Sequence, residues 1–169
     1  MVTVRVLESM EKESKYDTYY VYDTDIGRIA IASDGSAITK IKLDDWRKDF
    51  GLEQRCDIKD EAARQLVEYL AGTRQDFDVP LSPRGTEFQR AAWKALVSIP
   101  YGQTRTYKEI AEVIGSPKAC RAVGLANNRN PIWIMIPCHR VIGANGKLVG
   151  YAAGLEVKER LLGIERGGG

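Results

Sequence analysis

Residues 136–142 read Ile-Pro-Cys-His-Arg-Val-Ile and place a cysteine beside a histidine, close behind a proline. A thiol becomes a strong nucleophile when a base such as imidazole helps to remove its proton and a fixed backbone presents the sulfur. His139 is the only histidine in the 169 residues. An isolated Cys-His pair is usually structural, but the surroundings here make Cys138 a candidate nucleophile and His139 its candidate base.

The geometry of this pair depends on the backbone conformation. Adjacent side chains of a strand point to opposite faces, so Cys138 and His139 cannot share a proton directly if the segment is extended. Either the chain bends helically after Pro137, or a water molecule bridges the sulfur and the imidazole. A third group usually orients the imidazole, and Glu165 near the C-terminus is a candidate for that position.

Composition and cysteine usage narrow the class of protein. Hydrophobic residues make up 44% of the chain and charged residues 28%, as in globular proteins. No apolar run approaches about 18 residues and the N-terminus lacks a signal-peptide pattern, so we expect an intracellular, cytoplasmic protein. Cys56, Cys120 and Cys138 lack the spacing of a disulfide framework or a zinc site. We therefore expect no metal and no cofactor.

Charge is divided unevenly along the chain. Residues 1–82 contain 12 Lys and Arg against 17 Asp and Glu, a net charge of −5, whereas residues 83–169 contain 13 against 6, a net charge of +7. Residues 80–85 include two prolines and a glycine, so we predict a domain boundary there, with domains at 1–82 and 83–169. The basic half has the charge of a polyanion binder, although basic surfaces also serve solubility.

The N-terminal half predicts a small antiparallel sheet followed by a helix. Asp34 and Gly35 form a hairpin signal between two of the strands. Asp60 is expected to cap a helix in which apolar residues recur at spacings of three and four and which ends at Gly72. Residues 1–15 show little periodicity and are interpreted as a loose arm or an edge strand. The expected strands are residues 18–22, 27–32 and 37–43.

The C-terminal half is predicted to be mostly helical. Two capping-box signatures open helices, Thr86 with Gln89 and Thr106 with Glu109. The second of these helices ends at Gly115, and Ser116 is expected to cap the next, over residues 118–127. Two short helices joined in this way are typical of a helix-turn-helix, which is often only structural. Residues 132–136 are expected to form a buried strand that leads to Cys138, and residues 155–164 the last helix.

Several of these motifs are similar to those of the alkylguanine-DNA alkyltransferases, also called methylated-DNA:protein-cysteine methyltransferases. The resemblance rests on Asn130-Pro131, residues 136–142, Gly150-Tyr151 and residues 155–162, and on Tyr107, Arg121 and Asn130 at the family's intervals. It is close from about residue 85 to 165 and weaker before that. It implies an α/β (α+β) fold, with a small N-terminal ribonuclease H-like sheet-and-helix domain and a mostly helical C-terminal domain that carries a winged-helix-like helix-turn-helix.

The activity that this resemblance implies is DNA repair by direct transfer. An alkyl group, such as methyl, would pass from guanine O6, or less readily thymine O4, to Cys138, after the damaged nucleotide has flipped out of the duplex. Because a thioether is stable, each molecule would react once. The implied partner is double-stranded DNA containing alkylated guanine, and the protein is expected to be a monomer.

The resemblance also assigns roles to residues. His139 takes the thiol proton through water, and Glu165 steadies the imidazolium that results. Asn130 ties the helix-turn-helix to the active-site turn, and Arg121 fills the vacated base stack. Tyr107 offers a proton or a hydrogen bond to the departing base. Contacts along the DNA backbone are assigned to Tyr107, Lys108 and Ser116, and the walls of the substrate pocket to Val141, Tyr151 and Trp133.

Two other functions remain open. Alkyltransferase-like proteins recognise the lesion without chemistry, but they replace the acceptor cysteine that Cys138 supplies. A thiol hydrolase using Cys138 and His139 would turn over repeatedly on a small acyl substrate, which leaves the basic half and the helix-turn-helix unexplained. The sequence therefore favours alkyl transfer.

Overall fold

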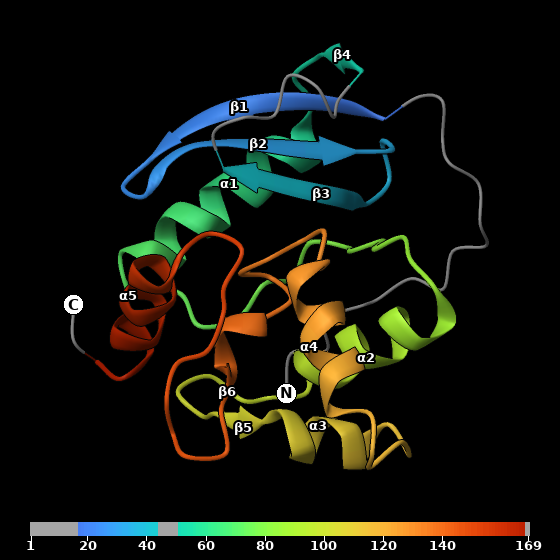
Figure 1. Ribbon diagram of the computed structural model, residues 1–169. Coiled ribbons are helices and arrows are strands. Elements are labelled where there is room, and N and C mark those ends of the chain that lie inside the picture. The colour runs from blue at the N-terminus through green and yellow to red at the C-terminus, as the bar shows by residue number, and fades with distance from the viewer. Residues whose placement is uncertain (1–16, 44–50, 168–169) are drawn as a thin grey trace. The chain divides into compact units, whose positions relative to one another are not determined.

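The computed structural model describes residues 17–43 and 51–167 (Figure 1). The chain divides into two compact units, Met1–Arg84 and Gly85–Gly169. The division falls two residues beyond the boundary expected after position 82. The arm or edge strand expected over residues 1–15 lies outside the described residues. No helix in the described part of the chain is both long and apolar enough to cross a membrane.

The N-terminal unit is a sheet with one helix, α1 (Asp57–Leu70), packed against it (Figure 1). The strands lie in the order β3-β2-β1-β4; β1 and β3 pair antiparallel with β2, and β4 pairs parallel with β1. The three strands expected from the sequence are present, each within two residues of its expected bounds. The strands of the sheet are β1 (Thr18–Thr24), β2 (Gly27–Ser33), β3 (Ile38–Leu43) and the short β4 (Leu52–Glu53).

Local side-chain chemistry explains the turn between β2 and β3. The Asp34 carboxylate accepts hydrogen bonds from the backbone N–H groups of Ser36 and Ala37, at 2.8 and 2.9 Å. Gly35 adopts a φ of 94°, which a residue without a Cβ reaches at little cost. The hairpin signal in the sequence is therefore confirmed.

Helix α1 begins earlier than the sequence indicates. Its first residue is Asp57, and Cys56 occupies the N-cap without a side-chain hydrogen bond, so the expectation that Asp60 caps the helix is wrong. The Asp60 carboxylate instead accepts from the Tyr22 hydroxyl at 2.7 Å and from Arg55 Nε at 2.9 Å. An acidic residue in the first turn is favourable near the helix N-terminus, so Asp60 can stabilise the helix without capping it.

The C-terminal unit is mostly helical, and both predicted capping boxes are present. In each, the threonine oxygen accepts from the backbone N–H three residues on, while the Gln89 or Glu109 side chain accepts from the threonine N–H. Trp93 is 1% exposed, and its Nε1 donates to the Ala126 carbonyl at 2.9 Å, which fastens α2 to α4. The helices are α2 (Glu87–Val97), α3 (Tyr107–Val113), α4 (Cys120–Asn128) and α5 (Leu155–Glu165), with β5 (Arg105–Thr106) paired parallel to β6 (Val141–Ile142).

Helices α3 and α4 pack together as the expected helix-turn-helix, but the second helix starts later than expected. Gly115 follows the end of α3 with a φ of 74°, as its sequence position indicates. The prediction that Ser116 caps the next helix is wrong, because its carbonyl accepts from Ala119 N–H in a separate turn and α4 begins at Cys120. Proline at position 117 suits this turn as well as it suits a first helical residue.

The buried strand expected over residues 132–136 is absent. The segment is buried, but it runs through successive turns, with Ile136 N–H donating to the Ile132 carbonyl at 2.9 Å. Ile134 has a φ of 71°, in a region that β-branched residues rarely occupy. A short apolar run indicates burial and does not by itself fix the backbone conformation, which explains the wrong prediction.

Candidate active site

The Cys-His pair lies in a short 3₁₀ helix, η1 (Cys138–Arg140), which begins directly after Pro137. Of the two arrangements that the sequence left open, the structure contains the helical bend. Cys138 N–H donates to the Ile136 carbonyl at 2.8 Å, and Arg140 N–H donates to the Pro137 carbonyl at 3.0 Å. The turn is buried: Cys138 is 5% exposed and His139 is fully buried. Proline thus starts a tight turn that presents the sulfur from a fixed backbone.

Glu165, at the end of α5, lies against this turn. His139 Nε2 is 2.8 Å from Glu165 Oε1, and the guanidinium of Arg140 donates to both carboxylate oxygens at 2.9 to 3.0 Å. Arg140 also donates to the Ile99 carbonyl at 2.6 Å. One buried carboxylate is therefore bound by two consecutive side chains, which fixes the imidazole ring.

Electrostatics keep this cluster in one protonation state. Burial acts to raise the pKa of Glu165, but hydrogen bonds from His139 and Arg140 outweigh it and lower that pKa to about 2. Burial lowers the pKa of His139, despite the neighbouring carboxylate, so the ring is neutral at pH 7. The nitrogen that faces the carboxylate, Nε2, then carries the proton, and the basic lone pair is on Nδ1.

The Cys138 thiol is held protonated. Burial raises its pKa, against the opposing effects of hydrogen bonds to Asn130 and Tyr151 and of the charge on Lys158. A thiol in this state needs a base to become a nucleophile. The base that the sequence proposes for this proton transfer, His139, is the next residue of η1.

Asn130 connects the end of the helix-turn-helix to the active-site turn. Its Nδ2 donates to the Ile136 carbonyl at 2.8 Å, and its Oδ1 accepts from Ile132 N–H at 3.0 Å. It follows the last residue of α4, Asn128, by two positions. The side chain therefore closes the loop that leads from α4 to Pro137.

Tyr107 approaches the active-site turn from α3, and Tyr151 from the segment before α5. Tyr107 opens α3, its hydroxyl donates to the Val149 carbonyl at 3.3 Å, and burial together with nearby Cys138 raises its pKa. Its ring lies beside Gly124 of α4, where an added Cβ would be 3.7 Å from the ring. The structure thus brings Tyr107 close to the cysteine that the sequence proposes as the acceptor.

The pocket residues proposed from the sequence also lie near the turn. The Tyr151 ring meets the Trp133 ring edge-on, with their centroids 6.2 Å apart. Trp133 is 9% exposed, and Val141, which follows η1 directly, is fully buried. The three side chains come from segments on both sides of Cys138.

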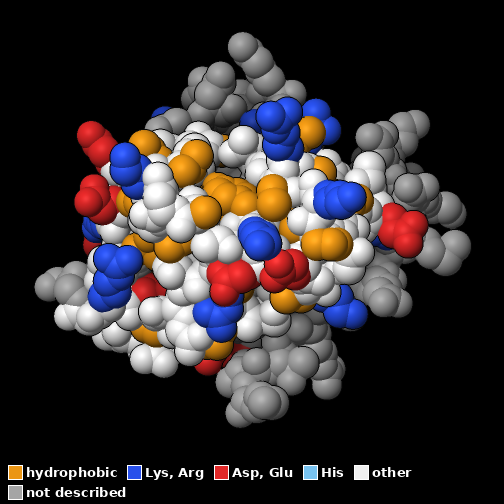
Figure 2. Space-filling model, turned by 60° about the horizontal axis from the view of Figure 1, so that its bottom comes forward, with side chains coloured by type: hydrophobic (Ala, Val, Ile, Leu, Met, Phe, Trp, Pro, Cys, Tyr) orange, Lys and Arg blue, Asp and Glu red, His pale blue; other side chains and the backbone are white. Residues whose placement is uncertain are grey.

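Arg121, Lys108 and Ser116 are not part of the cysteine cluster. Arg121 is exposed on α4 and Lys108 is exposed on α3, where it lies 3.9 Å from Glu112. Ser116 is partly exposed in the turn between the two helices. Figure 2 shows lysine and arginine side chains standing among apolar and acidic ones on the face turned forward. These three residues belong to the helix-turn-helix surface and not to the chemical centre.

Sequence reasoning missed two buried cations of the site. Arg140 follows the Cys-His pair directly, but in a basic half of the chain nothing marked it as buried. Lys158 is 1% exposed, and its Nζ donates to the Val141 and Val149 carbonyls at 2.6 and 3.2 Å. Lys158 precedes Glu165 by seven residues, which places both on one face of a helix, and this spacing is a signal that could have identified it.

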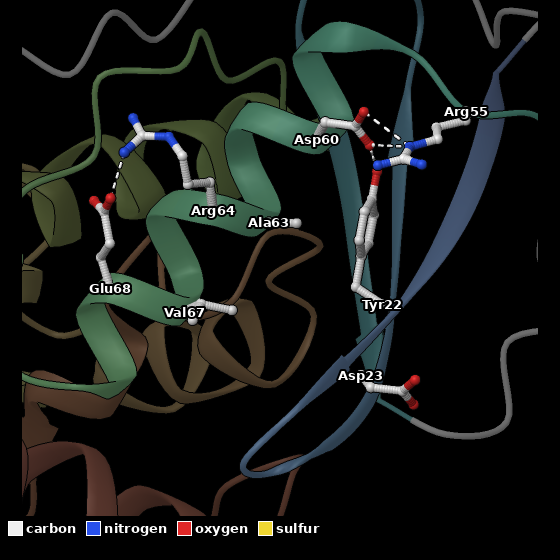
Figure 3. Close-up of a pocket in the computed structure, with 8 residues that line it drawn as sticks. All are labelled: Tyr22, Asp23, Arg55, Asp60, Ala63, Arg64, Val67 and Glu68. Carbon is white, nitrogen blue, oxygen red and sulfur yellow. Dashed lines mark hydrogen bonds and ion pairs between the residues drawn. The ribbon is translucent and has the colours of Figure 1, made fainter.

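Neither a metal cluster nor a charged pocket accompanies the cysteine site in the described part of the chain. No group of three or more His, Cys, Asp or Glu side chains in the described part of the chain could hold a metal ion. A pocket of about 360 Å³ lies between α1 and β1 in the N-terminal unit (Figure 3). Its arginines, Arg55 and Arg64, are paired with Asp60, Glu61 and Glu68. With its cations already neutralised, this pocket does not present a charged binding site.

Comparison with known proteins finds family matches for both units of the chain. The family model "6-O-methylguanine DNA methyltransferase, ribonuclease-like domain" matches residues 18–83, and "6-O-methylguanine DNA methyltransferase, DNA binding domain" matches residues 87–167. A Methanosarcina acetivorans protein named methylated-DNA--protein-cysteine methyltransferase is 53% identical over 152 residues, which are 87% of this chain and 97% of that protein. A Mycolicibacterium paratuberculosis protein of the same name is 48% identical over 151 residues, 88% of this chain and 92% of that protein.

A solved structure extends the similarity to the fold. The crystal structure of Mycobacterium tuberculosis OGT in complex with DNA superposes with a TM-score of 0.84 and 47% identity, covering 89% of this chain and 93% of that chain. The α/β fold, with a small sheet unit followed by a helical unit, is thereby confirmed. With both family models matched and relatives this similar along nearly their whole length, the chain belongs to the 6-O-methylguanine DNA methyltransferase family.

Proposed function

We propose that this protein repairs DNA by transferring an alkyl group from guanine O6, and less readily from thymine O4, to Cys138. The observation that carries the proposal is the buried thiol of Cys138 in a proline-started turn whose histidine is fixed by Glu165. The names of the relatives and the two family matches support a cysteine methyltransferase that acts on DNA. The protein acts where the DNA is, so an intracellular, cytoplasmic location is part of the proposal.

The transfer begins with proton removal. His139 Nδ1 accepts the proton of the Cys138 thiol through a water molecule, and Glu165 stabilises the imidazolium that forms. The thiolate attacks the alkyl carbon in line with the leaving base, so that the carbon–sulfur bond forms as the carbon–O6 bond breaks. The bonding electrons pass to the guanine. Tyr107, whose hydroxyl is close to the turn, donates a proton or a hydrogen bond to the departing base.

DNA binding is assigned to the helix-turn-helix. A base inside a duplex is unreachable for a buried thiol, so the damaged nucleotide flips into the pocket at a cost of a few kcal/mol. Arg121, exposed on α4, fills the vacated stack, and Tyr107, Lys108 and Ser116 contact the backbone. Asn130 carries the position of α4 to the active-site turn. Trp133, Val141 and Tyr151 form the walls around the flipped base.

The reaction consumes the protein. A thioether is stable, and the proposal assigns no group to its hydrolysis, so one protein molecule repairs one lesion as a monomer. The stoichiometry also separates this function from its alternatives. A thiol hydrolase turns over many times, and a lesion-binding module is not modified.

A mass measurement tests the proposal. The protein is incubated with an equimolar duplex containing O6-methylguanine, digested, and compared with Cys138→Ala and with protein given undamaged DNA. We expect a gain of one methyl group on the Cys138 peptide only, with Cys56 and Cys120 unmodified, because neither of these follows a proline or precedes an imidazole. Binding without a mass gain would leave a lesion-recognition module, and methylation of Cys138→Ala on another cysteine would reject Cys138 as the acceptor.

A further inference from the structure

Lys158 is a buried cation to which the reaction as described gives no role. It is 1% exposed, in the first half of α5. Burying an ammonium group is costly unless other groups compensate for its lost hydration. Its Nζ donates to the Val141 carbonyl at 2.6 Å and to the Val149 carbonyl at 3.2 Å, and lies 5.9 Å from the centroid of the Tyr151 ring. Within residues 17–43 and 51–167, no carboxylate forms an ion pair with it.

The same helix brings charges of opposite sign to the active-site turn. Glu165 binds His139 and Arg140, whereas Lys158, two helical turns earlier, binds the carbonyl of Val141 directly after η1. The charge of Arg140 is already balanced by Glu165. Lys158 is therefore a buried positive charge near the turn, and no anion is bound to it.

Cys138 becomes such an anion during the reaction. The two side chains already interact electrostatically: the charge of Lys158 opposes the effect of burial on the pKa of Cys138, and Cys138 likewise opposes the effect of burial on the pKa of Lys158. A thiolate formed at a 5% exposed position is costly without a neighbouring cation. The imidazolium of His139 faces Glu165, so it is already paired when the thiolate forms.

We propose that Lys158 is the counter-ion of the Cys138 thiolate and holds the two carbonyls, Val141 and Val149, that border the substrate pocket. This deepens the proposed function and rests on it. The Val149 carbonyl also accepts from the Tyr107 hydroxyl, at 3.3 Å. When Tyr107 turns to the departing guanine, Lys158 still donates to this carbonyl, so the carbonyl keeps a hydrogen-bond partner. Lys158 is thus a positioning residue that makes the thiolate and the tyrosine available together.

The test measures the ionisation of Cys138 without DNA, in protein whose other cysteines are changed by Cys56→Ser and Cys120→Ser. The rate of its reaction with iodoacetamide is followed against pH, and the thiolate is monitored in parallel by its ultraviolet absorption. Lys158→Met, Lys158→Gln and Lys158→Arg are compared with Lys94→Met, an exposed lysine of α2. The titratable or charged groups around the thiol are Tyr107 of α3, His139 and Arg140 of η1, Tyr151, and Lys158 and Glu165 of α5.

We expect Lys158→Met to raise the midpoint of thiolate formation by about 1 pH unit or more, as loss of a nearby opposite charge does. This corresponds to about a tenfold smaller thiolate fraction at neutral pH. Lys158→Gln keeps a hydrogen-bond donor without the charge and should give the same shift. Lys158→Arg keeps the positive charge, so its midpoint should be close to that of the parent protein. Lys94→Met should have the same midpoint as the parent.

An unchanged midpoint in both folded neutral variants would overturn the inference. If Lys158→Met does not fold, the comparison of Lys158→Gln with Lys158→Arg decides, because both retain donors and differ in charge. A purely structural lysine would give equal midpoints in these two variants. The two experiments can fail separately. If Cys138 is not the acceptor, the unchanged protein gains no methyl group in the mass experiment, whereas the titration can still show the shift.

Discussion

His139 Nε2 and Glu165 Oε1 lie 2.8 Å apart although 26 positions separate them in the chain, and both side chains are fully buried. The contact joins the active-site turn to the last helix. Arg140, next to His139, binds the same carboxylate. The end of α5 therefore contributes both to the orientation of the imidazole and to the stability of the C-terminal unit.

Removing the charge of Glu165 should destabilise the protein strongly. Glu165→Gln leaves the Arg140 guanidinium buried without a counter-ion, and breaking a buried pair in this way typically costs about 3 to 5 kcal/mol. We expect a decrease of that order in the free energy of unfolding, measured by urea denaturation. Glu159→Gln, on the exposed side of the same helix, is the matched control and should change stability by less than about 0.5 kcal/mol. Equal midpoints for the two variants would show that the cluster contributes no net stability.

Stability should also fall on acidification, in two stages. Burial places the pKa of His139 below its ordinary value of 6.5, so the unfolded chain binds a proton that the folded chain does not. This stabilisation is complete above about pH 6.5 and is lost as the pH falls toward the folded pKa. The pKa of Glu165 drops from 4.5 to about 2 on folding, so a second loss follows below pH 4.5.

The first stage can be assigned to one residue, because the chain contains one histidine. Melting temperatures of the parent protein and of His139→Gln, measured from about pH 7 to about pH 5 where imidazole titrates, should diverge in slope. The parent should lose stability across this range, and the variant should be nearly flat. The same slope in both proteins would contradict the assignment.

Arg121 should matter more for duplex DNA than for a free base. Only the duplex has a stack to be filled after flipping, so Arg121→Ala should slow methyl transfer from duplex DNA by at least about tenfold, given the few kcal/mol that flipping costs. Reaction with free O6-benzylguanine should stay within about twofold of the parent rate, since the residue is exposed on α4 and outside the cysteine cluster.

A second basic residue of the helix-turn-helix separates stacking from simple charge. Lys118→Ala removes one exposed positive charge from the turn that precedes α4. We expect it to weaken DNA binding with a strong salt dependence and to alter the single-turnover rate at saturating DNA little. If Lys118→Ala and Arg121→Ala slow the saturated rate equally, Arg121 acts only through its charge.

The parts of the structure that depend on local chemistry could be predicted from the sequence. Thr86 with Gln89 and Thr106 with Glu109 begin their helices as expected, because a capping box is completed within four residues. The hairpin at Asp34 is similarly local. Such features need no knowledge of the rest of the fold.

The wrong prediction of a strand over residues 132–136 has a different cause. The backbone between Asn130 and Pro137 is set by the Asn130 side chain, which binds two main-chain groups that a strand would have used otherwise. Glu165 could be proposed as the group that orients His139, because a catalytic imidazole is usually held by a third group such as a carboxylate. The burial of Arg140 could not be predicted, and that of Lys158 was indicated only by its seven-residue spacing from Glu165. Both depend on α5 packing against the turn, and lysine and arginine are seldom buried.

Alkylation of Cys138 should destabilise the protein. An alkyl group on Cys138 adds volume at a 5% exposed sulfur, in a turn that Pro137 and the hydrogen bond from Asn130 to the Ile136 carbonyl hold in place. Close-packed interiors tolerate extra methylene groups poorly, and overpacking typically costs about 1 to 3 kcal/mol. We expect the alkylated protein to melt at a lower temperature than the free protein, and the benzylated form lower than the methylated form. Asn130 is the first contact to be strained, so α4 should gain hydrogen exchange in the same samples. Cys138→Ala treated with the same substrates controls for bound base and should not change. Identical melting curves for the free, methylated and benzylated proteins would mean that the pocket absorbs the adduct without strain.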